Sequence, residues 1–255
     1  MTITQHQESD YVSEFDRDAR KTYLSDRYYE EGTGTSCFPI TLFLTVNNQC
    51  DLRCQMCDVG QRIPDTFFAR NTYNQEMTMT LDDWEKVIDD SLPYRPDICI
   101  ATTELLLYPE LIPLMKYIDE KGLTLHLTTN GYLLERFAAQ FVDIGFERLH
   151  VSLDGDQAMH DTIRGVPGAF KRAVKGIQSV AWLKDKRRTS YPEIHLYSVI
   201  VPLNYEEIDR TFESLAALPV DSLNFLHFGF VAEAMADAHN MRIGKILPIE
   251  PNSVS

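Results

Sequence analysis

The sequence predicts an α/β fold, a partial (β/α)6 TIM-like barrel with parallel strands. Short apolar segments rich in β-branched residues alternate with segments of helical periodicity, six times in all, up to about residue 230. With 44% hydrophobic residues among 255, the chain is long enough to bury one large core. Six units are fewer than the eight that close a TIM barrel, so we expect an open barrel.

The first predicted strand, residues 40–46, is apolar and leads directly into a group of cysteines. Thr80 is a suitable N-cap for the helix after them, because acidic residues fill its first turn. The following helix has Pro109 near its start and Gly122 past its end. The later predicted strands are 98–101, 123–129, 148–153, 193–201 and 222–230, and the predicted helices are 80–92, 109–122, 133–145, 168–184 and 205–218.

We divide the chain into three segments. Residues 1–36 are a polar N-terminal extension with a short helix near 11–29, residues 37–247 are the barrel domain, and residues 248–255 are a tail. The chain has neither a run of about 20 uncharged apolar residues nor a secretory pattern at its start. These features predict a cytoplasmic protein with no membrane association.

The charge balance is strongly acidic. The chain carries 24 Lys and Arg against 38 Asp and Glu, a formal charge of −14. This charge repels a phosphate backbone, so nucleic acid and anionic membrane surfaces are poor candidate partners.

Three of the five cysteines, Cys50, Cys54 and Cys57, crowd into the segment C-D-L-R-C-Q-M-C. Such crowding indicates a metal site and not a disulfide framework. The spacing lets a tight loop present three thiolates to three corners of an iron–sulfur cube and leaves the fourth iron open. Structural zinc stays an alternative, with Cys37, Cys99 or a histidine as fourth ligand, although the second CxxC knuckle usual in such sites is absent.

This spacing after a first strand resembles the signature of the radical S-adenosylmethionine (radical SAM) superfamily. TTNG at 128–131, and VSLDG followed by HDTIRG between 151 and 165, are similar to motifs of the branch with molybdenum-cofactor, peptide-modifying and sulfatase-maturing members. The resemblance covers roughly residues 38–230. It implies a [4Fe-4S] cluster on the three cysteines, SAM chelated to the open iron, and an external electron donor of the flavodoxin or ferredoxin type.

The resemblance also implies SAM contacts. The family's second strand ends in Gly-Gly-Glu-Pro, which receives the SAM ammonium, and this chain has Thr102, Thr103, Glu104 and Leu105 there. The acid is kept, while the glycines and the proline are replaced. Glu104 is therefore a candidate SAM ligand, with an ordinary solvated carboxylate as the alternative.

Further candidates follow the third and fourth strands. Ser152 matches the family's ligand-binding serine, and Asp154 either contacts SAM or caps the Asp-Gly turn. Arg164 either binds the SAM carboxylate or braces its loop. Asn130 is expected to contact the ribose or methionine part, with helix capping or an αL turn as the alternative.

Two apolar positions complete the expected SAM site. Met56 replaces the aromatic residue usual between the last two cysteines and is expected to cover the adenine with its thioether. The backbone of residues 199–201, and Val201 in particular, is expected to flank the adenine.

The strands also place several ring side chains along the barrel, to which we assign no catalytic role. They are His126, His150, His195 or Tyr197, and His227.

The resemblance implies reductive cleavage of SAM to a 5′-deoxyadenosyl radical, which abstracts hydrogen from a substrate. Because no cysteine follows Cys99, we expect a single cluster and a small metabolite or natural-product intermediate as substrate. Two alternatives are a peptide-modifying enzyme of the same superfamily and a non-catalytic or partner-dependent iron–sulfur protein. The short stretch after the sixth strand also predicts that the extension, a second copy or a partner protein covers the barrel.

Overall fold

The computed structural model describes residues 39–62, 79–101, 103–227, 237–241 and 245. The predicted N-terminal extension with its helix, the tail, Cys37 and Thr102 lie outside the described residues. Residues 237–241 are helical. No helix in the described ranges is long and apolar enough to cross a membrane.

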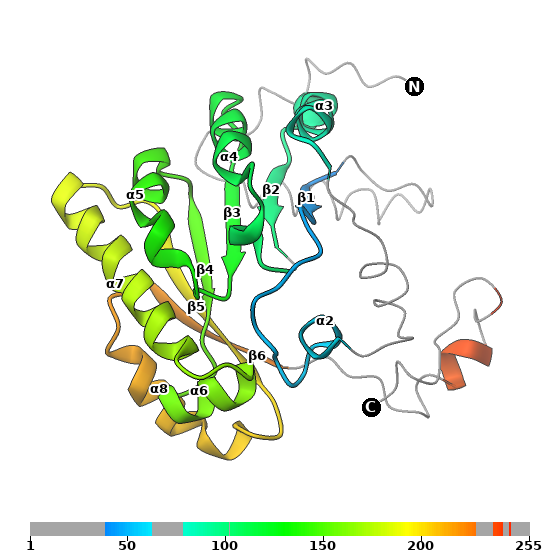
Figure 1. The fold of residues 1–255 in the computed structure, drawn as a ribbon. Coiled ribbons are helices and arrows are strands. Elements are labelled where there is room, and N and C mark those ends of the chain that lie inside the picture. Colours follow the sequence, from blue (N-terminus) through cyan, green and yellow to red (C-terminus); the bar gives the residue numbers. More distant parts are fainter. Residues whose placement is uncertain (1–38, 63–78, 102, 228–236, 242–244, 246–255) are drawn as a thin grey trace, which may run out of the picture.

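One six-stranded parallel sheet organises the fold (Figure 1). Its strands follow chain order from β1 to β6, each hydrogen-bonded to the next. The predicted α/β architecture with six parallel strands is therefore confirmed. The strands are β1 (Thr41–Leu44), β2 (Asp97–Ile100), β3 (Leu125–Thr129), β4 (Arg148–Ser152), β5 (Glu193–Ile200) and β6 (Ser222–His227).

Helices connect successive strands, and α4, α5 and α7 lie together on one face of the sheet (Figure 1). At the start of α3, Thr80 and Asp83 form a capping box, as the sequence predicts for an N-cap. The α-helices are α2 (Asp58–Gln61), α3 (Leu81–Ser91), α4 (Leu111–Glu120), α5 (Leu134–Ile144), α6 (Gln157–Arg164), α7 (Ala169–Arg187) and α8 (Ile208–Ala216), and the 3-10 turns are η2 (Leu92–Tyr94), η3 (Leu105–Leu107) and η4 (Tyr205–Glu207).

Several elements differ from the sequence prediction, and two of these differences lie next to the predicted site residues. Helix α6, for which the sequence predicts only a motif, begins after Asp156, whose side chain accepts the Met159 N–H at 3.0 Å. Strand β1 ends two residues earlier than predicted, because the Asn47 side chain bonds the Glu104 carbonyl at 2.9 Å and turns the chain into the cysteine loop.

The two faces of the sheet differ in polarity, because successive side chains of a strand point to opposite sides. Leu127, Leu149 and Leu196 are fully buried in the core beneath the helices. His150 and Tyr197 alternate with these residues along β4 and β5, and their rings stack with centroids 4.5 Å apart. The face without the core helices therefore carries polar and aromatic groups.

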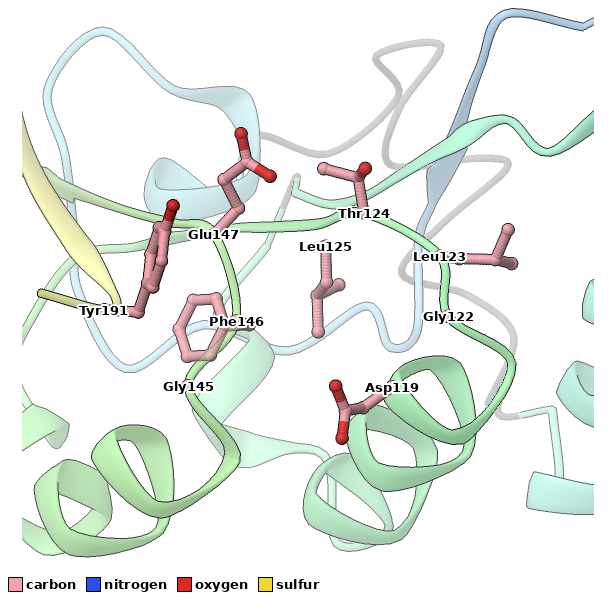
Figure 2. A pocket seen from close by; sticks show the side chains of 9 residues that line it. All are labelled: Asp119, Gly122, Leu123, Thr124, Leu125, Gly145, Phe146, Glu147 and Tyr191. Carbon is pink, nitrogen blue, oxygen red and sulfur yellow. The ribbon is translucent and has the colours of Figure 1, made fainter. Parts of the chain in front are cut away.

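A cavity of about 320 Å³ lies where β3 and β4 begin (Figure 2). Leu125, Phe146 and Tyr191 line it, and Asp119 and Glu147 add two carboxylates. Parallel strands begin at one edge and end at the other, so this cavity lies at the edge opposite the cysteine loop. It is separate from the candidate site.

Candidate iron–sulfur and SAM site

The cysteine loop follows β1 and descends to the same edge of the sheet as α6 (Figure 1). Leu52 is fully buried in a small cluster with Cys54 and Ala169, and Cys50 and Cys57 pack against this cluster. The apolar side chain of Leu52 thus holds the loop against the start of α7. Its burial brings the three cysteines predicted as cluster ligands to one place.

Backbone hydrogen bonds tie this loop to the end of α6. The Arg53 N–H donates to the Arg164 carbonyl at 2.9 Å, and the Gln55 N–H donates to the Ile163 carbonyl at 2.8 Å. The chains approach so closely that a Cβ on Gly165 would lie 2.3 Å from the Arg53 carbonyl oxygen. Gly165 also has a φ of +67°, which favours glycine. Gly165, the glycine of TIRG, therefore allows the cysteine loop to pack closely against the end of α6.

Polar donors reach two of the three thiols. Arg164 Nη1 lies 3.7 Å from Cys54 Sγ, and Asn130 Nδ2 lies 3.9 Å from Cys50 Sγ. Burial raises the pKa of the Cys50 thiol to about 11 and also raises that of Cys54, where Arg164 opposes the effect. A bound cation such as iron would favour the thiolate form of both cysteines.

Asp154 and Arg164 form a buried ion pair. Arg164 Nε donates to Asp154 Oδ2 at 2.5 Å, and the Asp154 side chain is 0% exposed. The other carboxylate oxygen accepts the Val199 N–H at 3.0 Å. Arg164 Nη2 is buried and has no hydrogen-bond partner in the described part of the chain. That nitrogen is a donor available to an anion.

Glu104 points into the protein and is 0% exposed. Its carboxylate accepts three hydrogen bonds, from the Leu106 N–H at 3.0 Å, the Thr129 hydroxyl at 2.7 Å and the Asn130 N–H at 2.8 Å. Burial raises its pKa to about 7. Glu104 is therefore no solvated surface carboxylate, and it fixes the end of β3.

Asn130 connects the end of β3 to the cysteine loop. Its Nδ2 donates to Asp51 Oδ1 at 2.8 Å, and its Oδ1 accepts the Tyr132 N–H at 2.8 Å. The second bond is a local turn of the kind considered from the sequence. On the neighbouring strand end, the Thr103 hydroxyl donates to the Asn47 carbonyl at 2.7 Å. Both side chains brace the loop that carries the cysteines.

The remaining predicted contacts lie at different depths. Met56 is half-buried and packs with the cysteine cluster, and Ser152 is half-buried at the end of β4. Val201 is buried, and its N–H donates to Asn204 Oδ1 at 2.8 Å. Val199 pairs through its carbonyl with Asn204 Nδ2 at 2.9 Å. These backbone groups of the fifth strand thus already have partners in the chain.

Two residues that hold Asp154, His160 and Asn204, are not among those predicted from the sequence. His160 Nδ1 accepts the Asp154 N–H at 3.2 Å, and Asn204 Nδ2 donates to the Asp154 carbonyl at 3.0 Å. His160 lies four residues before Arg164 in α6, so helical spacing places both on one face. That spacing was an available signal for His160, whereas Asn204 has no local signal.

Histidines on the polar face lie close to one another. The ring centroids of His150 and His195 are 5.6 Å apart, and those of His126 and His150 are 6.0 Å apart. Burial, followed by the charges of His195 and His126, lowers the pKa of His150 to about 4. His150 is therefore neutral at physiological pH. Tyr197 stacks on it and completes this group.

The donor set fits an iron–sulfur cluster. Three cysteines share one loop, and a guanidinium and an amide donate toward two of their sulfurs, as expected around the negative charge of ligated thiolates. Within the described ranges, no three Cys, His, Asp or Glu side chains gather closely enough to hold a single metal ion.

A family model, the radical SAM superfamily, matches residues 44–215. The chain belongs to the radical SAM superfamily. Members are enzymes that use a [4Fe-4S] cluster and SAM, which are the two cofactors that the sequence predicts. The matched segment contains the three loop cysteines together with Asp154 and Arg164.

Named relatives include an AdoMet-dependent heme synthase of Methanosarcina barkeri, 33% identical over 53% of this chain and 38% of the relative. A GTP 3′,8-cyclase of Microcystis aeruginosa is 28% identical over 73% of this chain and 55% of the relative. Streptococcus suis SuiB bound to S-adenosylmethionine has a similar fold, with a TM-score of 0.64 and 15% identity over 87% of this chain and 48% of SuiB. Such radical SAM neighbours are partial TIM barrels, which confirms the predicted architecture.

This radical SAM chain thus spans about half the length of these relatives, or less.

Proposed function

We propose that this protein is a radical SAM enzyme acting on a small metabolite or natural-product intermediate. When bound, the cluster and SAM supply one-electron cleavage of the SAM carbon–sulfur bond, which yields methionine and a 5′-deoxyadenosyl radical that takes a hydrogen atom from the substrate. The observation that carries the proposal is the convergence of the cysteine loop with the buried Asp154–Arg164 pair.

In this proposal Cys50, Cys54 and Cys57 bind the cluster. Arg164 offers Nη2, which has no partner among the described residues, to the SAM carboxylate, while Asp154 holds the guanidinium in place. A guanidinium suits this role because its planar set of N–H groups can donate hydrogen bonds to two partners at once.

Other predicted residues complete the proposed SAM site. Met56 lies in the cysteine loop, Asn130 bonds Asp51 of that loop, and Ser152 ends β4; all three are proposed to contact the ligand directly. Glu104 is proposed to act mainly by holding the Asn130 backbone, since three protein donors already engage its carboxylate. Thr102 and Thr103 are proposed to supply backbone contacts, and Val201, whose own backbone groups are bonded to residues 204 and 205, is proposed to flank the adenine.

The small-molecule substrate is supported by the names of the relatives, a heme synthase and a GTP cyclase. The polar histidine face offers hydrogen-bonding and stacking groups to such a substrate. We further propose an external electron donor of the flavodoxin or ferredoxin type, a cytoplasmic location, and a second copy or a partner protein as cover for the barrel.

The test is 5′-deoxyadenosine formation by the anaerobically reconstituted protein with SAM and dithionite. We expect product from the wild type, and none from Cys54→Ala. Cys99→Ala is the matched control, because Cys99 is a buried cysteine of β2 outside the loop, and this variant should retain the activity. A wild type that loads a complete cluster and forms no product would contradict the proposal and favour a non-catalytic iron–sulfur protein.

A stimulation assay tests the substrate class. Small-molecule and peptide fractions of a cell extract are added separately, and 5′-deoxyadenosine formation is compared between them. Stimulation by the small-molecule fraction is the expected result. Stimulation by the peptide fraction alone would instead support a peptide-modifying enzyme.

A further inference from the structure

The Arg164 guanidinium lies between a buried carboxylate and a cysteine of the loop. Nε contacts Asp154 Oδ2 at 2.5 Å, and Nη1 lies 3.7 Å from Cys54 Sγ. The side chains of Arg164 and Asp154 are 9% and 0% exposed. Water is therefore largely excluded, and the charge of Arg164 acts on the sulfur with little screening.

Three further hydrogen bonds fix the position of Asp154 and so of Arg164. Val199 N–H binds the carboxylate, Asn204 binds the Asp154 carbonyl, and His160 accepts the Asp154 N–H. The donors and acceptors come from β5, from the segment after it and from α6. Asp154 is thus held independently of the cysteine loop, so it can orient Arg164 toward Cys54.

We propose that Arg164 is a positioning residue that sets the reduction potential of the cluster through Cys54. A positive group that donates a hydrogen bond to a cluster thiolate stabilises the more negative, reduced form and raises the potential. Asp154 moderates this effect with its opposite charge. The inference rests on the proposed function, since it assumes that the three loop cysteines bind an iron–sulfur cluster.

The test is a redox titration of the reconstituted protein without SAM, followed by the EPR signal of the reduced cluster. Arg164→Met should shift the midpoint potential to a more negative value, because the charge and the donor are both lost. Arg164→Lys keeps the positive charge but loses the planar set of N–H donors, so its midpoint potential should shift in the same direction by a smaller amount.

Arg53→Met is the matched control. Arg53 lies in the same loop beside Cys54, but its side chain donates to the Leu52 carbonyl at 2.9 Å and is half-buried. It carries the same charge as Arg164 without a contact to a thiol among its described bonds. Its removal should leave the potential close to the wild-type value, since solvent screens the charge.

Arg164→Lys also serves where Arg164→Met fails to take up a cluster. It keeps the positive charge at this position, and it should still shift the midpoint potential to a more negative value because the guanidinium N–H near Cys54 Sγ is lost.

Several results would overturn the inference. These are an unshifted potential in Arg164→Met, an equal shift in Arg53→Met, or an unshifted potential in Arg164→Lys where Arg164→Met binds no cluster. A wild type that binds no cluster would overturn the proposed function and this inference together. A loaded wild type with an unshifted Arg164→Met would overturn the inference alone, and the 5′-deoxyadenosine assay would then still test the function.

Discussion

Replacing Gly165 by alanine should detach the cysteine loop from α6. The added methyl group would lie 2.3 Å from the Arg53 carbonyl oxygen and 2.9 Å from the Arg53 Cβ. The φ of +67° costs a non-glycine residue about 1 kcal/mol. Overlap with a fixed backbone oxygen adds about 1 to 3 kcal/mol, because one of the two chains must move. The expected loss in the free energy of unfolding is therefore about 2 to 4 kcal/mol.

Gly168→Ala is the matched control for this prediction. Gly168 also has a positive φ, +83°, but a Cβ there would meet no atom within 4 Å. Only the conformational cost of about 1 kcal/mol should remain. The assays are urea unfolding of the metal-free protein and iron content after anaerobic reconstitution. Gly165→Ala should lose both stability and iron, whereas equal losses in the two variants would refute the close approach of loop and helix.

Two further predictions concern buried polar groups. Glu104→Gln should destabilise the protein by about 1 to 3 kcal/mol, because an amide N–H would face the Asn130 N–H. The assay is urea unfolding, and an unchanged free energy of unfolding would contradict the hydrogen bonds assigned to Glu104. Burial lowers the pKa of His160 from 6.5 to about 4. Between these pH values the imidazole is protonated in the unfolded state and neutral in the folded state, so the folded state loses stability as the pH falls from 6.5 to 4. The stability advantage of the wild type over His160→Asn should therefore shrink between pH 6.5 and 4, by at most about 3 kcal/mol, and a constant difference would disprove this linkage.

The parts of the site that the sequence predicts are those encoded locally. Cys50, Cys54 and Cys57 lie within eight residues, so their spacing alone indicates one loop with three sulfur ligands. The six strands are equally local, because each is a short apolar segment between helical ones. The cysteine loop and the six strands can therefore be predicted without knowledge of distant contacts, and both are present in the structure.

The orientations of the polar side chains depend on distant partners. Glu104 bonds Thr129 and Asn130, which are about 25 residues away, and Asn204 bonds Asp154 across 50 residues. No spacing within one segment encodes such pairs. The sequence therefore identifies Glu104 and Asp154 as candidates without showing that the first fixes the end of β3 and the second holds Arg164.

The most direct test of the central claim is the EPR spectrum of the reduced, reconstituted protein with and without SAM, alongside its iron and sulfide content. If the three loop cysteines hold a cluster with an open iron, the protein should contain four irons and four sulfides, and SAM should change the spectrum. Zinc without iron or sulfide, or a cluster spectrum that SAM leaves unchanged, would contradict the account.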